Sequence, residues 1–105
     1  MERTELLELI ESKEIIGVDF SGQRLEKIDF TGCRIERTSF KGCELVHCRF
    51  RNAKISWSDF RYAEIQHGTF EDAEIEFSDF YRAFIDGVVI FSGSSFYNCS
   101  LNKTY

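Results

Sequence analysis

The chain has 105 residues, so it forms one domain at most. Its formal net charge is −5 at pH 7, with 13 Lys and Arg against 18 Asp and Glu, and this acidic balance argues against direct nucleic-acid binding, which needs a basic surface. The sequence shows no secretory signal and no apolar run long enough to cross a bilayer.

Residues 1–14 predict a short amphipathic helix, in which Leu6, Leu7 and Ile10 share one face and Gly17 acts as the stop. We interpret this helix as a cap over the first turn of the remaining chain, residues 15–105. A partner-binding or membrane-surface helix is the alternative. The acidic polar face disfavours the membrane, because interfacial helices are usually rich in Lys and Arg.

From Ile15 to Ile90 every fifth residue is apolar, a period that belongs neither to a helix nor to a flat strand. If each apolar centre is position i, residue i−2 is usually small or apolar. A spacing of two puts both residues on the same side of an extended backbone. Positions i+1 and i+2 should then form a corner, and five of the seven glycines lie at i+2. These are Gly17, Gly22, Gly32, Gly42 and Gly87.

The centres alternate Phe with Ile or Leu from residue 15 to residue 85. Four sides per coil would sort the two kinds into separate columns, whereas three sides would mix them, so we predict twenty residues per coil. Stacked coils would pair as parallel strands roughly 4.8 Å apart. The predicted Phe columns are Phe20, Phe40, Phe60 and Phe80 on one side, and Phe30, Phe50 and Phe70 on the opposite side.

The lattice resembles the pentapeptide-repeat family. Val18-Asp19-Phe20-Ser21-Gly22 fits that family's pattern of a small apolar residue, Asp or Asn, Leu or Phe, a polar residue and Gly; Ile28-Asp29-Phe30-Thr31-Gly32 is close to it. The resemblance covers about residues 15–101. It implies an all-β, right-handed quadrilateral parallel β-helix of about four and a half coils.

After Ile90 the next centres are Phe96 and Leu101, so we place one extra residue in a bulge or small loop within residues 91–95. The four residues after Leu101 leave no room for a second cap. The last half-coil is strongly apolar, and we expect two chains to meet there end to end. The residues of this candidate dimer end are Val89, Phe91, Phe96, Tyr97 and Leu101.

The four cysteines all fall at i−2 and are predicted to be free thiols in the core, which suits a reducing, bacterial cytoplasm. Disulfides and metal binding are the alternatives. His47 and His67 should stack on adjacent coils of one corner, where two imidazoles could bind a metal, although no third ligand is evident. No catalytic constellation, cofactor motif or phosphate loop is present, so we predict a protein that is not an enzyme and holds no cofactor.

The outward positions suggest a surface for a protein partner. Arg37, Trp57 and Phe77 form a column on one corner, which is either a self-satisfied ladder or a binding surface. Phe84, Tyr62 and Tyr81 add aromatic surface on other sides. Eight acids follow in the later coils and are opposed there only by Arg61 and Arg82: Asp59, Glu64, Glu71, Asp72, Glu74, Glu76, Asp79 and Asp86.

The family resemblance implies an alternative function, because some members mimic duplex DNA and bind DNA gyrase or related type II topoisomerases. Duplex DNA carries about 13 charges over ~22 Å, the length expected of this rod, and the chain has a net charge of only −5. We therefore predict a non-enzymatic scaffold or interaction module. A topoisomerase-directed DNA mimic is the runner-up, and a small enzyme or metal binder that uses the His47–His67 corner is the third reading.

Overall fold

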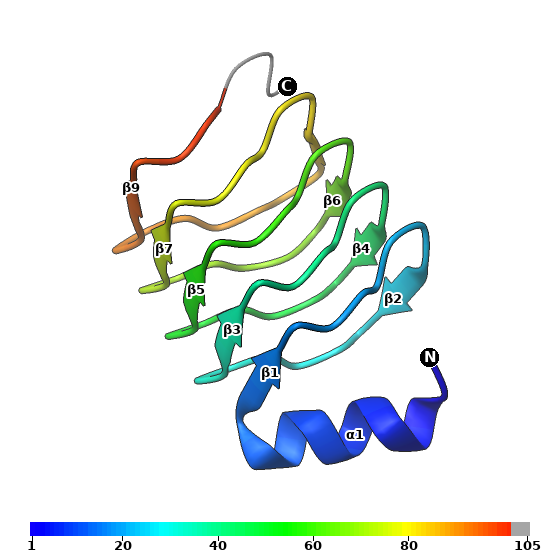
Figure 1. Ribbon diagram of the computed structural model, residues 1–105. Coiled ribbons are helices and arrows are strands. Elements are labelled where there is room, and N and C mark those ends of the chain that lie inside the picture. Colours follow the sequence, from blue (N-terminus) through cyan, green and yellow to red (C-terminus); the bar gives the residue numbers. More distant parts are fainter. Residues whose placement is uncertain (102–105) are drawn as a thin grey trace.

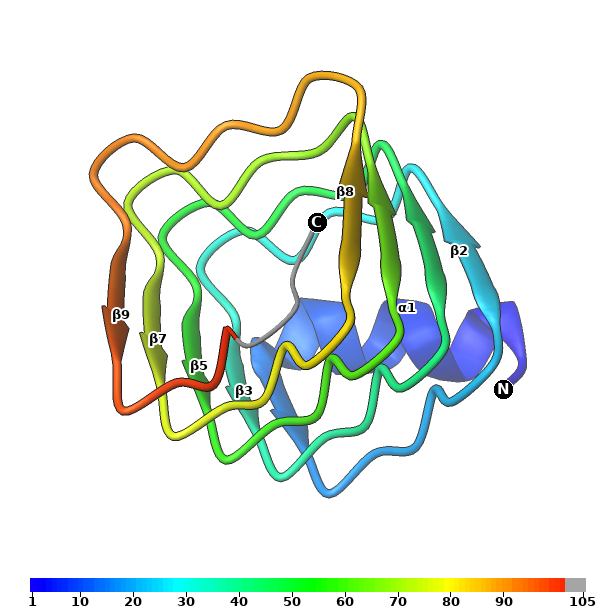
Figure 2. The same cartoon turned by 90° about the horizontal axis from the view of Figure 1, so that it is seen from above.

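Within residues 1–101, which the computed structural model describes, three-residue strands stack into two parallel sheets on opposite sides of a coiled chain (Figures 1 and 2). One sheet contains β1 (Glu14–Ile16), β3 (Arg34–Glu36), β5 (Lys54–Ser56), β7 (Glu74–Glu76) and β9 (Ser95–Tyr97). The other contains β2 (Arg24–Glu26), β4 (Glu44–Val46), β6 (Glu64–Gln66) and β8 (Phe84–Asp86).

Paired centres such as Ile15 and Ile35 are twenty residues apart, so each coil has twenty residues. This confirms the predicted quadrilateral β-helix of about four turns. Among residues 1–101, strands form on the two sides that carry Ile or Leu and not on the two sides that carry Phe. On the Phe sides the chain turns immediately after the centre, as where the Gln23 N–H donates to the Phe20 carbonyl at 3.0 Å. These sides therefore make single bridges, such as Asp19 with Ser39, instead of strands.

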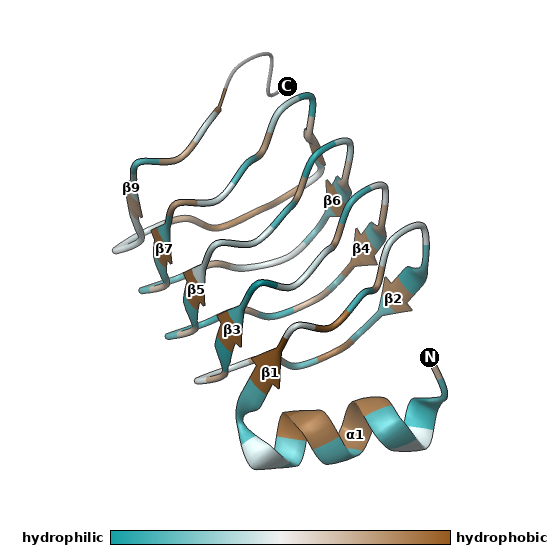
Figure 3. Cartoon of the chain, viewed as in Figure 1, coloured by the Kyte–Doolittle hydropathy of each residue, from teal (hydrophilic) through white to brown (hydrophobic). Residues whose placement is uncertain are grey.

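The core consists of the apolar columns that the lattice predicts. Phe40 and Phe60 stack with their ring centroids 4.8 Å apart, and Phe50 and Phe70 stack at 4.7 Å in the facing column. Rings of the two columns meet edge to face, which is a preferred arrangement for aromatic pairs. Figure 3 shows the apolar residues at the centres of the strands and along one stripe of the helix.

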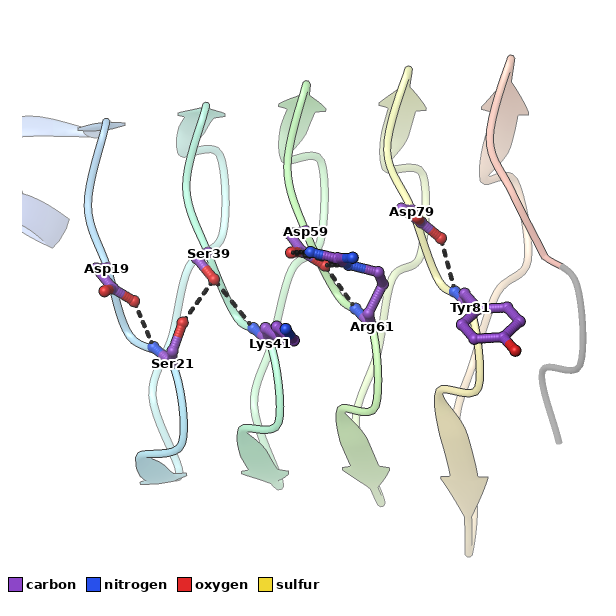
Figure 4. Close-up of polar contacts among 8 residues, drawn as sticks. All are labelled: Asp19, Ser21, Ser39, Lys41, Asp59, Arg61, Asp79 and Tyr81. Atoms are coloured by element: carbon purple, nitrogen blue, oxygen red, sulfur yellow. Dashed lines mark hydrogen bonds and ion pairs between the residues drawn. The ribbon is translucent and has the colours of Figure 1, made fainter.

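A polar residue directly before the Phe centre closes the turn on one side of each coil (Figure 4). The Asp19 carboxylate accepts the backbone N–H of Ser21 at 2.8 Å, and the Asp79 carboxylate accepts that of Tyr81 at 2.8 Å. The hydrogen bond from Ser21 lowers the pKa of the Asp19 carboxyl. This contact gives a physical reason for the Asp in the sequence pattern, because a short acidic side chain can satisfy the turn's free N–H.

Position i+2 is the corner of every side, and it takes the left-handed backbone conformation whether or not it is Gly. Gly22 has φ of 71°, but Trp57 and Phe77 also lie at 52° and 49°. Such angles cost a residue with a Cβ about 1–2 kcal/mol relative to Gly. The fold therefore carries local strain at the corners that lack glycine.

Helix α1 (Arg3–Ser12) lies across the N-terminal end of the coil and packs against β1 (Figure 1). Its end differs from the expectation: Lys13 adopts the left-handed conformation, its N–H caps the Ile10 carbonyl, and Gly17 is a corner instead of a stop. Leu6 is buried and Leu9 and Ile10 pack on the core, whereas Leu7 is largely exposed. The buried face thus follows the three-to-four-residue helical spacing from Leu6.

The extra residue lies before Ile90, and the sequence-based placement within residues 91–95 was wrong. Ile65 pairs with Ile85 at a spacing of twenty, but Thr69 bridges Ile90 at a spacing of twenty-one. Phe91 therefore replaces Ile90 as the centre. The inserted residue is Val88, which is 69% exposed, while Val89 packs on the core. Phe91 occupies the central position because its ring continues the Phe70 column, with the two ring centroids 5.3 Å apart.

Residues 102–105, where no second cap was expected, lie outside the described part of the chain. Across the residues that are described, no helix is long and apolar enough to cross a membrane.

Candidate interaction surface

The predicted corner column brings the Trp57 and Phe77 rings together, and Tyr97 extends them into a row of aromatic rings. We call this row, Trp57, Phe77 and Tyr97, the aromatic ladder. The Trp57 and Phe77 rings stack with centroids 4.6 Å apart and planes 8° from parallel. The Tyr97 ring packs edge-on against Phe77 at 5.7 Å. Trp57 and Tyr97 are each 61% exposed, so the ladder presents a broad aromatic surface to solvent.

The ladder differs from its sequence-based form at both ends. Arg37 occupies the corner below Trp57, in the expected column. The cation–π contact found among residues 1–101 is made by Arg82 over the Tyr81 ring, on another side of the coil, and involves neither Arg37 nor Trp57. Tyr97, which was expected at the dimer end, joins the ladder because β9 pairs with β7 and places Tyr97 beside Glu76.

Carboxylates border the ladder on both sides. Glu76 is the last residue of β7 and directly precedes Phe77. Asp59 and Asp79 lie after the same corner, on the next side of the coil. The Arg61 guanidinium holds Asp59 at 2.7 Å. Burial raises the pKa of the Asp59 carboxyl, but hydrogen bonds from Arg61 outweigh burial and leave that pKa below its usual value. The Arg61 charge offsets that of Asp59, so the negative charge beside the ladder comes from Glu76 and Asp79.

The remaining predicted site residues lie on other faces. Phe84 pairs with Glu64 on the opposite sheet, next to Asp86, and is half exposed. Tyr62 packs edge-on against Tyr81. Glu71 lies 3.7 Å from Arg51 on a further side, followed by Asp72 at the corner. The eight acids thus form a belt around the later coils and do not share one face.

The buried thiols occupy the positions that the lattice assigns to them. Cys33, Cys43 and Cys48 are buried and Cys99 is partly buried, and all four are free. The Cys43 thiol donates to the Phe20 carbonyl at 2.9 Å. Burial raises the pKa of the Cys43 and Cys48 thiols to about 11, which suppresses the reactive thiolate.

The His47 and His67 rings stack on adjacent coils as predicted, with centroids 5.2 Å apart. No group of three metal-ligating side chains forms among residues 1–101. Sequence reasoning missed a groove of about 660 Å³ beside this corner, lined by both imidazoles. The shape of the groove depends on how residues of neighbouring coils stack around Gly68. A local sequence pattern does not predict such contacts between coils.

The C-terminal end of the coil bears an apolar hollow of about 360 Å³, lined by core side chains of the last coil and the one before it. Phe91 and Phe96 are only partly buried there, and Leu101 is half exposed, whereas Val89 packs on the core and does not line the hollow. The hollow contains Phe80, Ile85, Phe91, Phe96 and Leu101.

Comparisons with known proteins agree with this architecture. A family model described as a pentapeptide repeat region matches residues 14–80. A solved pentapeptide-repeat protein from the Arabidopsis thaliana thylakoid lumen is 26% identical with a TM-score of 0.76; the match covers 83% of this chain and 61% of that one. The chain thus spans less than two thirds of that protein's length.

Two cyanobacterial pentapeptide-repeat proteins are more distant. Rfr23 from Cyanothece is 10% identical, with 99% of this chain and 96% of that chain covered and a TM-score of 0.46. HetL from Nostoc, involved in heterocyst differentiation regulation, is 16% identical, with 87% and 37% covered and a TM-score of 0.39. No curated protein matches the sequence.

Proposed function

The chain belongs to the pentapeptide-repeat family, whose members are generally structural or interaction modules, and on this premise we propose that it is a non-enzymatic module that binds a protein partner through the aromatic ladder. The partner's contact patch presents Arg or Lys side chains, because carboxylates border the exposed rings. Cationic side chains over aromatic faces gain about 0.5–1 kcal/mol even at exposed sites.

The observation that carries this proposal is the exposure of the ladder's large rings, since Trp57 and Tyr97 are each 61% exposed. Trp57 and Phe77 adopt left-handed backbone angles that Gly17 reaches without strain in the same column. Their stacking returns about 0.5–1.5 kcal/mol, less than the strain of about 1–2 kcal/mol at each of the two corners, so the pair brings the fold no net gain. Exposed Trp and Tyr are also enriched among residues that dominate binding energy.

A capture experiment from the native host tests the proposal. Immobilised wild-type protein is compared with a ladder variant, Trp57→Ala with Phe77→Ala, and with a control variant, Phe84→Ala, that removes an exposed aromatic ring from the opposite sheet. We expect a protein that the wild type and the control retain and the ladder variant loses. Equal retention by all three would contradict the proposal.

The belt of acids around the later coils supports a second candidate, a DNA mimic that binds DNA gyrase or a related topoisomerase. A supercoiling assay with and without the protein tests it. This candidate predicts inhibition, or protection from a gyrase-directed drug, that disappears when Glu74, Glu76 and Asp79 are reversed to Lys. Unchanged gyrase activity with excess wild-type protein would exclude it.

We further propose that a second copy of the chain covers the apolar hollow at the C-terminal end. Partly exposed Phe91 and Phe96 line the hollow, and an end-to-end pair would bury them and the unpaired edge of the last coil. Sedimentation at tens of micromolar should show a dimer that Phe96→Lys dissociates. A monomer for the wild type, or an unchanged size for the variant, would contradict this pairing.

The free thiols favour a reducing compartment, and we propose the bacterial cytoplasm. Alkylation of intact cells before lysis tests this: the four thiols should be recovered without disulfides. Recovery of an intermolecular disulfide through Cys99, the partly buried thiol, would argue for an oxidising compartment.

A further inference from the structure

A groove of about 660 Å³ runs beside the His47–His67 corner, and we call it the basic groove. One wall carries Lys27, His47 and His67, and the other carries Asp29, Arg49, Thr69 and Ile90. The floor is formed by Ile28, Cys48 and Gly68, and Val88 stands at the C-terminal end. This corner follows β4 and β6, half a coil from the corner that follows β5 and β7, so the groove and the aromatic ladder lie on opposite corners of the rod.

Hydrogen-bond donors face the groove from both walls. The Val88 N–H donates to Nδ1 of His67 at 3.2 Å, so the neutral His67 ring carries its proton on Nε2 and can donate from there. Across the groove, the Thr69 hydroxyl oxygen accepts the Glu71 N–H at 3.0 Å, which leaves the hydroxyl proton for a ligand. A ligand that fills the groove must therefore offer several acceptor atoms.

The charges favour an anion. Lys27 and Arg49 line the groove against a single carboxylate, Asp29, although the whole chain is acidic. Asp29 is already engaged, because it accepts the Thr31 N–H at 3.0 Å. That hydrogen bond, together with the nearby Arg49 and Lys13 charges, lowers the pKa of the Asp29 carboxyl. The Asp29 carboxyl therefore stays ionised, and Lys27 and Arg49 leave the groove with an excess of one positive charge over it.

The groove changes character along the rod. Lys27 and Arg49 belong to its earlier coils, whereas Val88 and Ile90 belong to its last coil and are 69% and 43% exposed. The inserted residue causes this difference, because Val88 has no counterpart at the same register position in the preceding coil and its N–H instead donates to the His67 ring of that coil. A ligand aligned with the rod would meet positive charge at one end and apolar surface at the other.

We propose that the basic groove binds a small phosphomonoester, with its phosphate between Arg49, Lys27 and the imidazole N–H groups and its apolar body against Val88 and Ile90. A phosphate group presents three oxygens, which suits donors on two walls. Arginine and lysine are the side chains that most often bind such groups. The site is separate from the ladder and does not depend on the proposed partner.

Nuclear magnetic resonance of the uniformly labelled protein tests the proposal, with phenyl phosphate, inorganic phosphate and benzyl alcohol as probes at one pH and ionic strength. We expect phenyl phosphate to shift the amides of His47, Arg49, His67 and Val88 in a saturable manner, and to bind more tightly than either other probe. Equal affinities for phenyl phosphate and inorganic phosphate, or shifts spread evenly over the rod, would overturn the proposal.

Two variants with the same change of charge supply the matched comparison. Arg49→Gln removes the groove's guanidinium, and Arg51→Gln removes an exposed guanidinium two residues away that faces Glu71. Loss of a charge-assisted hydrogen bond should weaken phenyl phosphate binding about tenfold in Arg49→Gln and leave Arg51→Gln near the wild type. Equal weakening by both variants would mean that only the general charge matters, and it too would overturn the proposal.

Discussion

The Phe91 ring stacks on the Phe70 ring with centroids 5.3 Å apart and planes 4° from parallel. This contact carries one Phe column past the inserted Val88, so the coil resumes its register within a few residues. Ile90 is displaced to the surface, where it is 43% exposed. The insertion therefore changes the outer surface of the last coil and leaves the core columns continuous.

Phe91→Ala should destabilise the protein more than Ile90→Ala. Phe91 is partly buried against Phe70, so its truncation is expected to reduce the free energy of unfolding by about 2 kcal/mol, compared with less than about 1 kcal/mol for Ile90. Urea denaturation of the two variants measures the difference. If Ile90→Ala lowered the free energy of unfolding more than Phe91→Ala, Ile90 would be the core residue and the inserted residue would follow it. That result would contradict the placement of the insertion at Val88.

Gly87→Ala should be more harmful than Gly32→Ala. Both glycines have φ near 70°, at 70° and 72°, which costs an Ala about 1–2 kcal/mol. A Cβ at Gly32 meets nothing within 4 Å, whereas a Cβ at Gly87 would overlap the His67 ring. We expect His67→Ala to relieve the additional loss in the Gly87→Ala background. Equal free energies of unfolding for the two single variants would contradict this packing.

The cysteines should differ sharply in alkylation rate. Burial raises the pKa of Cys43 and Cys48 to about 11, so at pH 8 little of either thiol is ionised in the folded protein. Cys99 is the partly buried thiol. We expect iodoacetamide to modify Cys99 first, with the core thiols labelled together on unfolding, as followed by mass spectrometry. Rapid native labelling of Cys43 would contradict its placement.

The Asp59–Arg61 contact should make stability depend on acid pH. The pKa of Asp59 is lower in the folded chain than its unfolded value of about 3.9, so its contribution is present above that pH and is lost as pH falls through the folded pKa. Below about pH 4, the free energy of unfolding of Asp59→Asn should therefore fall less steeply with decreasing pH than that of the wild type. Glu64→Gln makes the same change of charge on β6 and serves as control in urea denaturation at several pH values. If the free energy of unfolding of Asp59→Asn had the same pH dependence as that of the wild type, the Asp59–Arg61 contact would not contribute to acid-dependent stability.

Much of the fold follows from the spacing of residues in the sequence. The alternation of Phe with Ile or Leu every five residues predicts four sides and twenty residues per coil, because only that closure sorts the centres into columns. The placement of each cysteine and the stacking of His47 on His67 follow from the same register.

The departures arise where two residues satisfy the pattern equally well. Ile90 and Phe91 are both apolar, so apolarity alone could not locate the insertion. Gly93 was an available signal, since it lies two residues after Phe91 and adopts the glycine corner conformation with φ of 73°. The end of α1 was missed because Lys13, a residue with a Cβ, takes the left-handed capping role that glycine usually fills.

The candidate surfaces were only partly predictable. The corner register brings Trp57 and Phe77 together, but the insertion places Asn98 at the next corner, so Tyr97 packs against Phe77 from the position beside Glu76. The basic groove depends on the His67 ring and the displaced Val88, which are contacts between coils. Such contacts between distant parts of the chain leave no signature in a short sequence window.

The ladder carries its own reporter, since Trp57 is the only tryptophan in the sequence. Its fluorescence emission during titration with a short arginine-rich peptide tests most directly whether the ladder binds cationic partners. Two charge-reversed variants serve as the comparison: Glu76→Lys with Asp79→Lys beside the ladder, and Glu64→Lys with Asp86→Lys on the opposite sheet.

We predict a saturable change in Trp57 emission for the wild type and the Glu64/Asp86 variant, and its loss in the Glu76/Asp79 variant. An emission that does not respond to the peptide in the wild type, or an equal loss in both variants, would contradict the ladder as the binding surface.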